Sequence, residues 1–320
     1  MTSRRTAVLA IGSSFIGGAG VAVQNSVNGH VSALTGSPIL ATAVNHGTAL
    51  VLSILVGVAM GAFPRAWRQL RARRFELRVW WFLGGVLGFF ALTTLIATTP
   101  IVGLVTLTVA LTLGQLSGSL VADLWGLGPG GRKPPSVWRI AGLACAVVAV
   151  FVGAWGRLDG AQPLLLGAVV AAGILVAIQQ AANGQLTAVT GEFAVMSTIN
   201  FVVGGTLVLA TLLVTHAITP QDLGALPPWA PVGGAVGAVV GVTVAISVRY
   251  VGILSVMLAI VAGQAVAAIV LDLVIPVDRG QLGPGSFLGA ALAIVAVGLA
   301  GWTGRRRRAP QSAPVPPATP

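Results

Sequence analysis

Amide side chains interrupt two long apolar runs of this sequence. The first run reads AVQNSVNGHVSALTG over residues 22–36, and the second reads AIQQAANGQLTAVTG over residues 177–191. Residues four apart share a helix face, so the amides of each run lie on one side of a predicted helix. Amides both donate and accept hydrogen bonds, which suits a binding site for a polar or zwitterionic solute. The six amides are Gln24, Asn25 and Asn28 in the first run and Gln179, Gln180 and Asn183 in the second.

Further polar side chains recur at matching positions within other apolar stretches. The pairs are Asn45 with Asn200, Gln115 with Gln264, and Asp123 with Asp272. We take the four additional amides as substrate-binding candidates together with the first six. The two aspartates are candidates for proton coupling, because a carboxyl group within a membrane helix can carry a proton during a transport cycle. Two alternatives stay open: the amides join helices as hydrogen-bonded pairs, and the aspartates are solvated at helix ends.

No constellation typical of an enzyme is present. The three histidines are scattered, Cys145 is the single cysteine, and no metal-ligand spacing, phosphate-binding loop or nucleophile elbow occurs. His46 is interpreted as a hydrogen-bonded helix residue rather than as a proton relay, because the sequence shows no partner for it. The sequence therefore predicts a protein that is not an enzyme and holds no cofactor and no metal.

The composition places the chain in a membrane. Hydrophobic residues make up 56% of it, charged residues 8%, and the mean hydropathy is +0.94, which leaves too little polar surface for a soluble globule. Apolar stretches of roughly 20 residues, the length that crosses a bilayer, recur along the chain. The predicted class is an all-α polytopic membrane protein with ten transmembrane helices, at about 6–26, 38–63, 79–98, 101–124, 137–155, 163–186, 193–216, 229–248, 252–275 and 285–303.

Several of these apolar stretches carry glycines at a spacing of four residues. Examples are Gly84 with Gly88 and Gly233 with Gly237. This spacing places small residues on one stripe of a helix, where a neighbouring backbone can approach closely. We therefore interpret these glycines as packing positions and assign them no substrate role.

The basic residues follow the membrane topology. The formal net charge is +11, yet the arginines and lysines lie at helix ends rather than on a soluble domain, which excludes a nucleic-acid partner. With the amino terminus inside, sixteen of the 18 basic residues fall on the cytoplasmic side, so both termini are predicted to be cytoplasmic. Six arginines lie between Arg65 and Arg78, in a predicted loop with Trp67 and Phe75, and such a segment favours contact with anionic headgroups.

The chain contains an internal duplication. Gln24 and Gln179 differ by 155 positions, and Gln115 and Gln264 differ by 149, a nearly constant offset. Each half holds five predicted helices, and an odd number means that the halves enter the membrane from opposite sides. We predict a first repeat at residues 1–156, a second, inverted repeat at 157–304, and a basic, Pro/Ala-rich disordered cytoplasmic tail at 305–320. Inverted repeats are typical of secondary transporters.

With the motif QNSVNG, the GSP of residues 36–38, the paired GQ motifs and the terminal aspartate Asp123, the chain resembles the drug/metabolite transporter superfamily, specifically a bacterial branch in which two five-helix repeats are fused. The likeness covers nearly everything from Thr6 to Trp302. It implies a ten-helix fold and transport of a small molecule. Unlike the small multidrug exporters of the superfamily, the chain has no acidic residue in its first helix, so their drug/proton antiport mechanism is not carried over.

The resulting hypothesis is a transporter of the bacterial inner membrane, and more specifically an exporter. It moves a small polar or amphipathic metabolite by alternating access of the two repeats. The expected partners are this substrate and the lipid bilayer, with a homodimer left open. The alternatives are a lipid-handling or flippase-like protein and a membrane scaffold without transport activity.

Overall fold

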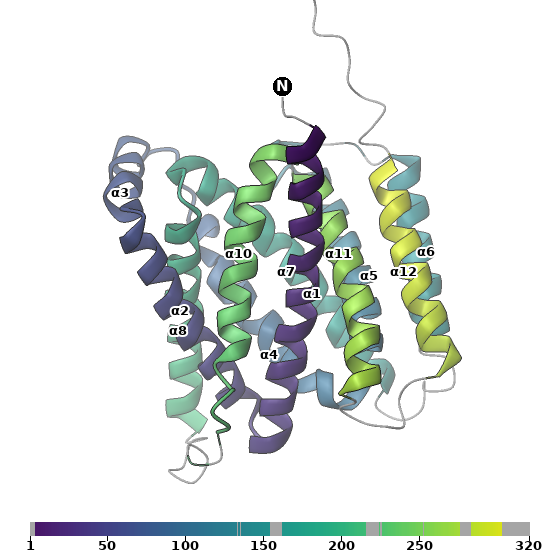
Figure 1. The fold of residues 1–320 in the computed structure, drawn as a ribbon. Helices are drawn as coiled ribbons and strands as arrows, with labels where there is room; N and C mark the ends of the chain where they lie inside the picture. Colours follow the sequence, from purple (N-terminus) through teal and green to yellow (C-terminus); the bar gives the residue numbers. More distant parts are fainter. Residues whose placement is uncertain are drawn as a thin grey trace, which may run out of the picture.

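The chain folds into long helices that lie side by side (Figure 1). The computed structural model describes residues 4–132, 134, 136–153, 162–215, 224, 226–251, 253–275 and 283–302, and no strand occurs among them. Lipid offers no hydrogen-bond partner to main-chain N–H and C=O groups. An α-helix satisfies these groups internally, so apolar segments that cross a membrane form helices. The helices of the first half are α1 (Arg4–Thr35), α2 (Pro38–Ala59), α3 (Ala62–Ala72), the short 3-10 helix η1 (Val79–Leu83), α4 (Gly84–Val102), α5 (Leu104–Trp125) and α6 (Val137–Gly153). Those of the second half are α7 (Gln162–Thr190), α8 (Phe193–Thr215), α10 (Val232–Val251), α11 (Ile253–Val274) and α12 (Pro284–Trp302).

The predicted all-α membrane class is confirmed. Six segments of the described chain are long and apolar enough to cross a membrane: Val8–Thr35, Pro38–Ala59, Val79–Val102, Leu104–Trp125, Gln162–Thr190 and Phe193–Thr215. Four apolar helical segments are shorter: Val137–Gly153, Val232–Val244, Leu258–Val274 and Pro284–Leu299. The count of ten spans stays a prediction. The predicted tail and the boundary between residues 156 and 157 lie outside the described residues.

Helix ends differ from the prediction where local chemistry decides them. The sequence pattern predicts an end of the first helix near residue 26, but α1 continues to Thr35, because Gln24 and Asn28 find a hydrogen-bond acceptor in Asn45 of α2 and do not interrupt it. It ends at Gly36, whose φ of 65° few other residues adopt. Ser37 then caps α2, and its hydroxyl accepts a hydrogen bond from the Leu40 N–H at 3.2 Å.

Part of the predicted basic loop is a helix. The segment from residue 62 to 72 forms α3, whose buried residues Ala62 and Ala66 pack with Val195 of α8. Its arginines remain exposed. The membrane-span pattern used for the prediction misses a helix of this kind, because α3 is short and apolar on one side only.

The two halves use equivalent helices for equivalent contacts. The helix α1 packs on α10 and α11, and α7 packs correspondingly on α4 and α5; α2 meets α8, and α6 meets α12. Close approach depends on glycines: a Cβ at Gly18 of α1 or at Gly173 of α7 would overlap main-chain atoms of the facing helix. These two glycines are 155 positions apart, like the amides.

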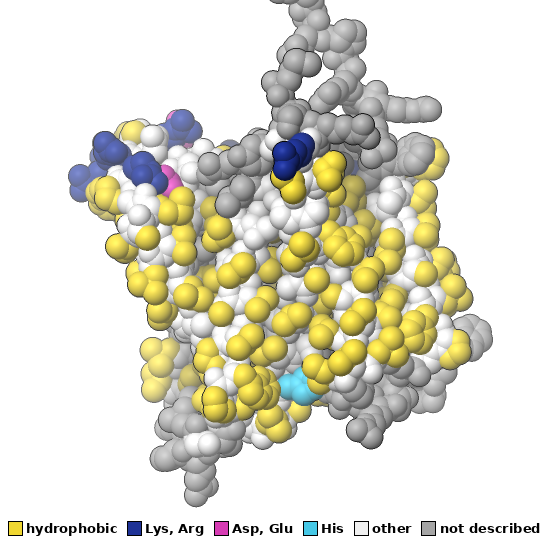
Figure 2. Space-filling model, viewed as in Figure 1, with side chains coloured by type: hydrophobic (Ala, Val, Ile, Leu, Met, Phe, Trp, Pro, Cys, Tyr) yellow, Lys and Arg dark blue, Asp and Glu magenta, His cyan; other side chains and the backbone are white. Residues whose placement is uncertain are grey.

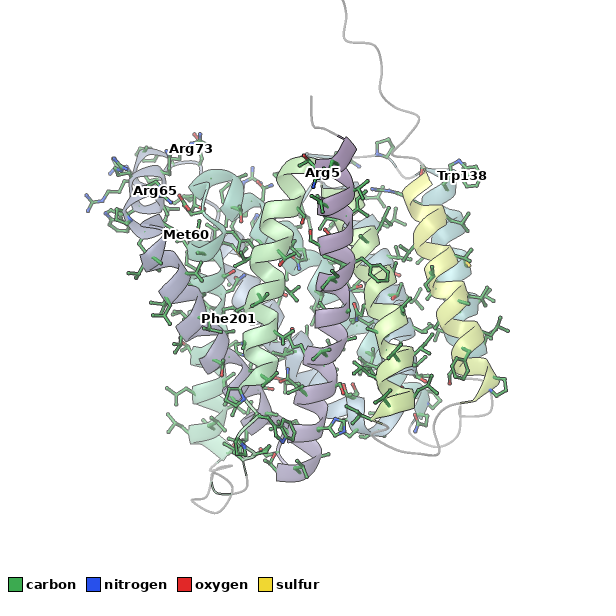
Figure 3. The ribbon with its side chains drawn as sticks, in the orientation of Figure 1. Arg5, Met60, Arg65, Arg73, Trp138 and Phe201 are labelled. Carbon is green, nitrogen blue, oxygen red and sulfur yellow. The ribbon has the colours of Figure 1, made fainter. Side chains whose placement is uncertain are left out.

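The helices α1 and α7 begin at opposite ends of the molecule. Arg5, in the first turn of α1, lies at the same end as Arg65 of α3 (Figure 3). Arg65 forms an ion pair with Glu192, two residues beyond the end of α7. The helix α7 therefore ends where α1 starts.

The largest buried apolar cluster lies mainly among α4, α5, α7, α11 and α12. On the surface, apolar side chains cover the middle of the helices, whereas the blue basic side chains gather at one end, over α3 and the start of α1 (Figure 2). This distribution is the one that a lipid-facing belt with a basic interface requires.

Candidate functional site

A cavity of about 920 Å³ lies among helices of both halves. Its wall is built mainly from α1, α2, α4 and α5 and from their counterparts α7, α8, α10 and α11, with one residue each from α6 and α12. Nine of the ten amides proposed for substrate binding line it: Gln24, Asn25, Asn45, Gln115, Gln179, Gln180, Asn183, Asn200 and Gln264. The tenth, Asn28, does not.

The amides of α1 and α2 form one hydrogen-bonded cluster. The Oδ1 atom of Asn45 accepts from Gln24 Nε2 at 3.1 Å and from Asn28 Nδ2 at 3.0 Å. Asn28 is only 1% exposed and packs on Gly233 of α10, where a Cβ would collide with its side-chain oxygen. Asn28 thus joins three helices and does not line the cavity.

The amides of α7 and α8 form the corresponding cluster. Asn200 Nδ2 donates to Asn183 Oδ1 at 2.6 Å. A Cβ at Gly84 of α4 would lie 2.7 Å from that same Asn183 oxygen, and Gly84 is 149 positions before Gly233. The two clusters are therefore equivalent in sequence and in packing. Hydrogen-bonded amides therefore join helices, as the first alternative left open by the sequence held, and several of them also border the cavity.

Several amides of the cavity wall have a buried polar atom without a hydrogen-bond partner among the described protein atoms. These atoms are Asn25 Nδ2, Gln115 Oε1, Asn200 Oδ1 and Gln264 Nε2. A buried polar atom without a partner costs about 1–3 kcal/mol. Rotation of these side chains toward the cavity would allow a polar solute or water to supply the missing partner.

The two candidate aspartates have different surroundings. Asp123 lines the cavity and pairs with Arg139 of α6, and each side chain is about one-fifth exposed. Asp272 is 8% exposed, and its Oδ2 atom accepts a hydrogen bond from the Val105 N–H at 2.9 Å, in the first turn of α5. Solvation at a helix end, which the sequence left open for both, is wrong for Asp272.

His46 and Phe201 face one another across the two halves. They occupy equivalent positions, 155 apart, their rings contact edge to face with centroids 5.7 Å apart, and both line the cavity. His46 Nδ1 lies 3.1 Å from the Thr42 carbonyl oxygen, within hydrogen-bonding distance, which confirms its interpretation as a hydrogen-bonded helix residue. Sequence reasoning missed its place in the cavity, although the matching position of Phe201 was a signal for it.

The cavity extends toward the basic end of the molecule. Its wall includes Val56, one turn before Met60, and Arg139, next to Trp138; Met60 and Trp138 both lie toward that end (Figure 3). At the opposite end, Val105 and Asp272 do not belong to the wall. No group of three or more potential metal ligands occurs among the residues that the structure describes.

Comparison with known proteins decides the family. A family model described as "Putative inner membrane exporter, YdcZ" matches residues 9–152 and again residues 164–299. The chain belongs to this family. The family is a branch of the drug/metabolite transporter superfamily, so the resemblance stated from the sequence is confirmed. Membership makes the chain a multi-pass protein of the inner membrane and supports transport as its function.

Nine chains among the solved structures also match. One of them, described only as "Crystal structure of protein", is 16% identical, has a TM-score of 0.59, and the alignment covers 96% of this chain and 100% of that chain. At this identity the likeness concerns the fold alone. Comparison with curated proteins finds no match.

Proposed function

We propose that this family member is a secondary transporter that exports a small polar or amphipathic metabolite. The observation that carries the proposal is the cavity of about 920 Å³ with amides from both halves in its wall. Its volume suits a small molecule. Its wall combines amides with apolar residues such as Leu95 and Val176, so a solute with polar and apolar parts fits it best. A membrane scaffold needs no such cavity.

We further propose ten spans arranged as two inverted five-helix repeats. The four shorter apolar segments supply the spans beyond the six longer ones. The family model matches once in each half, and α7 ends at the end where α1 begins. The arginine-rich end is then cytoplasmic, both termini lie on that side, and the conformation described is open toward the cytoplasm.

The aspartates supply a basis for alternating access. In this conformation Asp272 of α11 accepts a hydrogen bond from the Val105 N–H and so holds the first turn of α5 against α11. Asp123, by contrast, faces the cavity. The position equivalent to Val105 in the second half, 149 residues later, is Leu254, in the first turn of α11. We propose that in the outward-open state Asp123 leaves Arg139 and accepts from the Leu254 N–H, while Asp272 is released.

The first experiment is a thermal-stabilisation screen of purified protein in detergent with amino acids, nucleosides, polyamines and amphipathic amines. A ligand that binds the folded state raises its stability by RT ln(1 + [L]/Kd). A hit is then followed as flux in proteoliposomes.

Gln179→Ala tests the cavity assignment, and Gln185→Ala is the matched control. Both glutamines lie on α7, but Gln185 bonds to the Leu127 carbonyl at 3.0 Å and does not line the cavity. We expect Gln179→Ala to weaken binding of the hit about tenfold, the effect of one lost hydrogen bond of about 1.4 kcal/mol, and Gln185→Ala to leave it unchanged. Equal effects of the two variants would rule out the cavity as the binding site.

A further inference from the structure

The helix α3 and the start of α8 enclose a second, apolar groove. Its volume is about 560 Å³, and its wall includes Phe63, Trp67 and Leu70 of α3 and Ile199 of α8. The one hydroxyl in the wall, that of Thr198, already donates to the Ala194 carbonyl at 2.8 Å. The groove therefore offers contact area for a hydrocarbon and little hydrogen-bonding specificity.

Arginines continue the helix beyond the groove. Residues 65–78 contain six arginines and one acidic residue, Glu76. Arg71 lies one turn after Trp67, with its guanidinium 4.7 Å from the centroid of that ring, and Arg68 lies one turn after the groove residue Pro64. Residues four apart lie above one another on a helix, so two rows of side chains that line the groove end in a positive charge.

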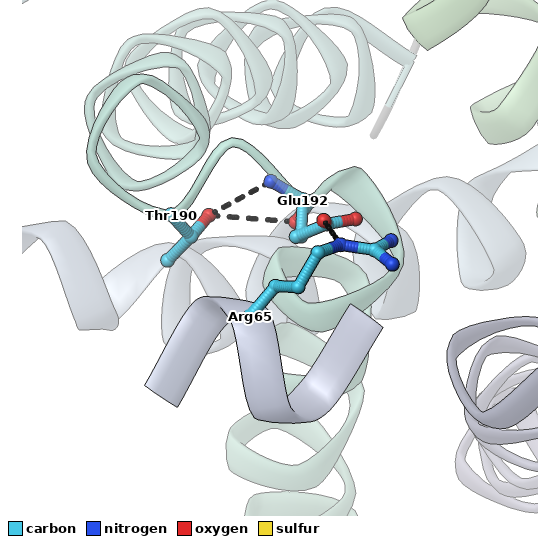
Figure 4. Close-up of polar contacts among 3 residues, drawn as sticks. All are labelled: Arg65, Thr190 and Glu192. Atoms are coloured by element: carbon cyan, nitrogen blue, oxygen red, sulfur yellow. Dashed lines mark hydrogen bonds and ion pairs between the residues drawn. The ribbon is translucent and has the colours of Figure 1, made fainter. Parts of the chain in front are cut away.

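Arg65 has a different role from these arginines. Its Nε atom lies 2.5 Å from Glu192 Oε1 and ties α3 to the connection between α7 and α8, beside Thr190 (Figure 4). The Glu192 carboxylate also raises the pKa of Arg65. Arg68 and Arg71 form no ion pair among the residues that the structure describes and remain available to an external anion.

The apolar and basic parts of α3 follow one another in the same order as the acyl chain and the headgroup of a phospholipid in a membrane. Met60, Arg65 and Arg73 follow one another toward the basic end of the molecule in Figure 3, so the apolar half of α3 lies nearer the membrane interior than its last arginines. Trp67, 56% exposed, is the amphipathic residue type that favours the level of the headgroups.

We propose that the groove between α3 and α8 binds an anionic phospholipid, with an acyl chain along Phe63 and Ile199 and the headgroup phosphate on Arg68 and Arg71. The site is separate from the central cavity and does not depend on the transport proposal. It is more specific than a general attraction of basic segments to the membrane surface, because it requires the groove as well as the charges.

The test measures lipid binding to the full chain in neutral detergent. The probes are dioleoyl phosphatidylglycerol, dioleoyl phosphatidylcholine, which has the same acyl chains, and inorganic phosphate. We expect phosphatidylglycerol to bind at least about tenfold more tightly than phosphatidylcholine, because each nearby arginine contributes a factor of about five, and inorganic phosphate to give no detectable binding. Tight phosphate binding would replace the lipid site by a simple anion site and overturn the proposal.

Two variants separate charge from shape. Arg68→Gln with Arg71→Gln should reduce the preference for phosphatidylglycerol to less than about threefold, whereas Arg5→Gln with Arg132→Gln removes two exposed charges elsewhere and should retain it. Ile199→Trp fills the groove without a change of charge and should weaken the binding of both lipids.

The proposed site would be contradicted if both double arginine variants lost the preference for phosphatidylglycerol equally. It would also be contradicted if Ile199→Trp, in protein that elutes from size-exclusion chromatography as the wild type does, left lipid binding unchanged. Gln179→Ala, in the central cavity, should leave phosphatidylglycerol binding unchanged. Failure of the transport proposal and failure of the lipid site are therefore distinguishable.

Discussion

At the scale of single residues, Asp123 and Asp272 show how equivalent positions acquire different partners. They are 149 positions apart, yet one faces the cavity beside Arg139 and the other is buried at the first turn of α5. A carboxylate at a helix N-terminus is favoured by the helix dipole and satisfies an N–H that has no partner within the helix. The alternating access proposed above accounts for this difference, because the two aspartates would exchange their surroundings between its two conformations.

Substitution of Asp272 tests its bond to α5. Asp272→Ala removes the acceptor of the Val105 N–H and leaves a buried donor unpaired, which costs about 1–3 kcal/mol. Asp272→Asn keeps an acceptor oxygen and should cost less. In thermal unfolding in detergent, the melting temperature should be highest for the wild type, lower for Asp272→Asn and lowest for Asp272→Ala. Equal melting temperatures for wild type and Asp272→Ala would show that the bond does not hold the first turn of α5.

Substitution of Asp123 tests proton coupling. Asp123→Asn removes the one carboxyl group among the wall residues of the described cavity, so substrate flux in proteoliposomes should lose most of its dependence on pH. Glu76→Gln, which removes an exposed carboxylate outside the cavity, should keep the wild-type profile. A pH profile that Asp123→Asn leaves intact would exclude Asp123 as the proton carrier.

Sequence reasoning reached the amide set because polar residues inside apolar runs are costly and need partners. It could not separate Asn28 from its neighbours, because only the folded arrangement of the helices shows which of these amides line the cavity and which is buried outside its wall. For the same reason it found no partner for His46, which contacts Phe201 only once the two halves have come together.

At the scale of elements, glycines that face another helix determine which pairs of helices can pack closely. Gly173 of α7 faces the main chain of α5, and a Cβ there would lie 2.5 Å from the Leu111 carbonyl oxygen. Glycines four apart predict close packing, and Gly84 and Gly233 confirm it, whereas the choice of partner helix depends on tertiary structure. The helix α3 escapes sequence prediction because its buried face consists of small side chains such as Ala62.

A pair of alanine substitutions on α7 tests the close contact between α5 and α7. Gly173→Ala should destabilise the protein by about 1–3 kcal/mol through overpacking. Gly167→Ala, where nothing lies within 4 Å of the added Cβ, should be neutral or stabilise the helix by about 0.5–1 kcal/mol. The two variants are compared by thermal unfolding in one detergent. A Gly173→Ala protein as stable as Gly167→Ala would mean that α5 and α7 are not in close contact.

At the scale of the whole molecule, the helix contacts of one half repeat those of the other, and amides of both halves surround one cavity. The inverted repeats proposed above would give two related conformations by exchange of the roles of the two halves. We propose that this one cavity becomes accessible from both sides of the membrane in turn.

Thiol labelling tests that claim most directly. Ser197 lines the cavity, whereas Ser26 is buried outside its wall, so Ser197→Cys and Ser26→Cys, each combined with Cys145→Ala, form a matched pair. The measurement is the reaction of a membrane-impermeant maleimide with each variant in right-side-out and in inside-out vesicles. We predict labelling of Ser197→Cys in both orientations and of Ser26→Cys in neither, and labelling of Ser197→Cys from one side only would contradict alternating access.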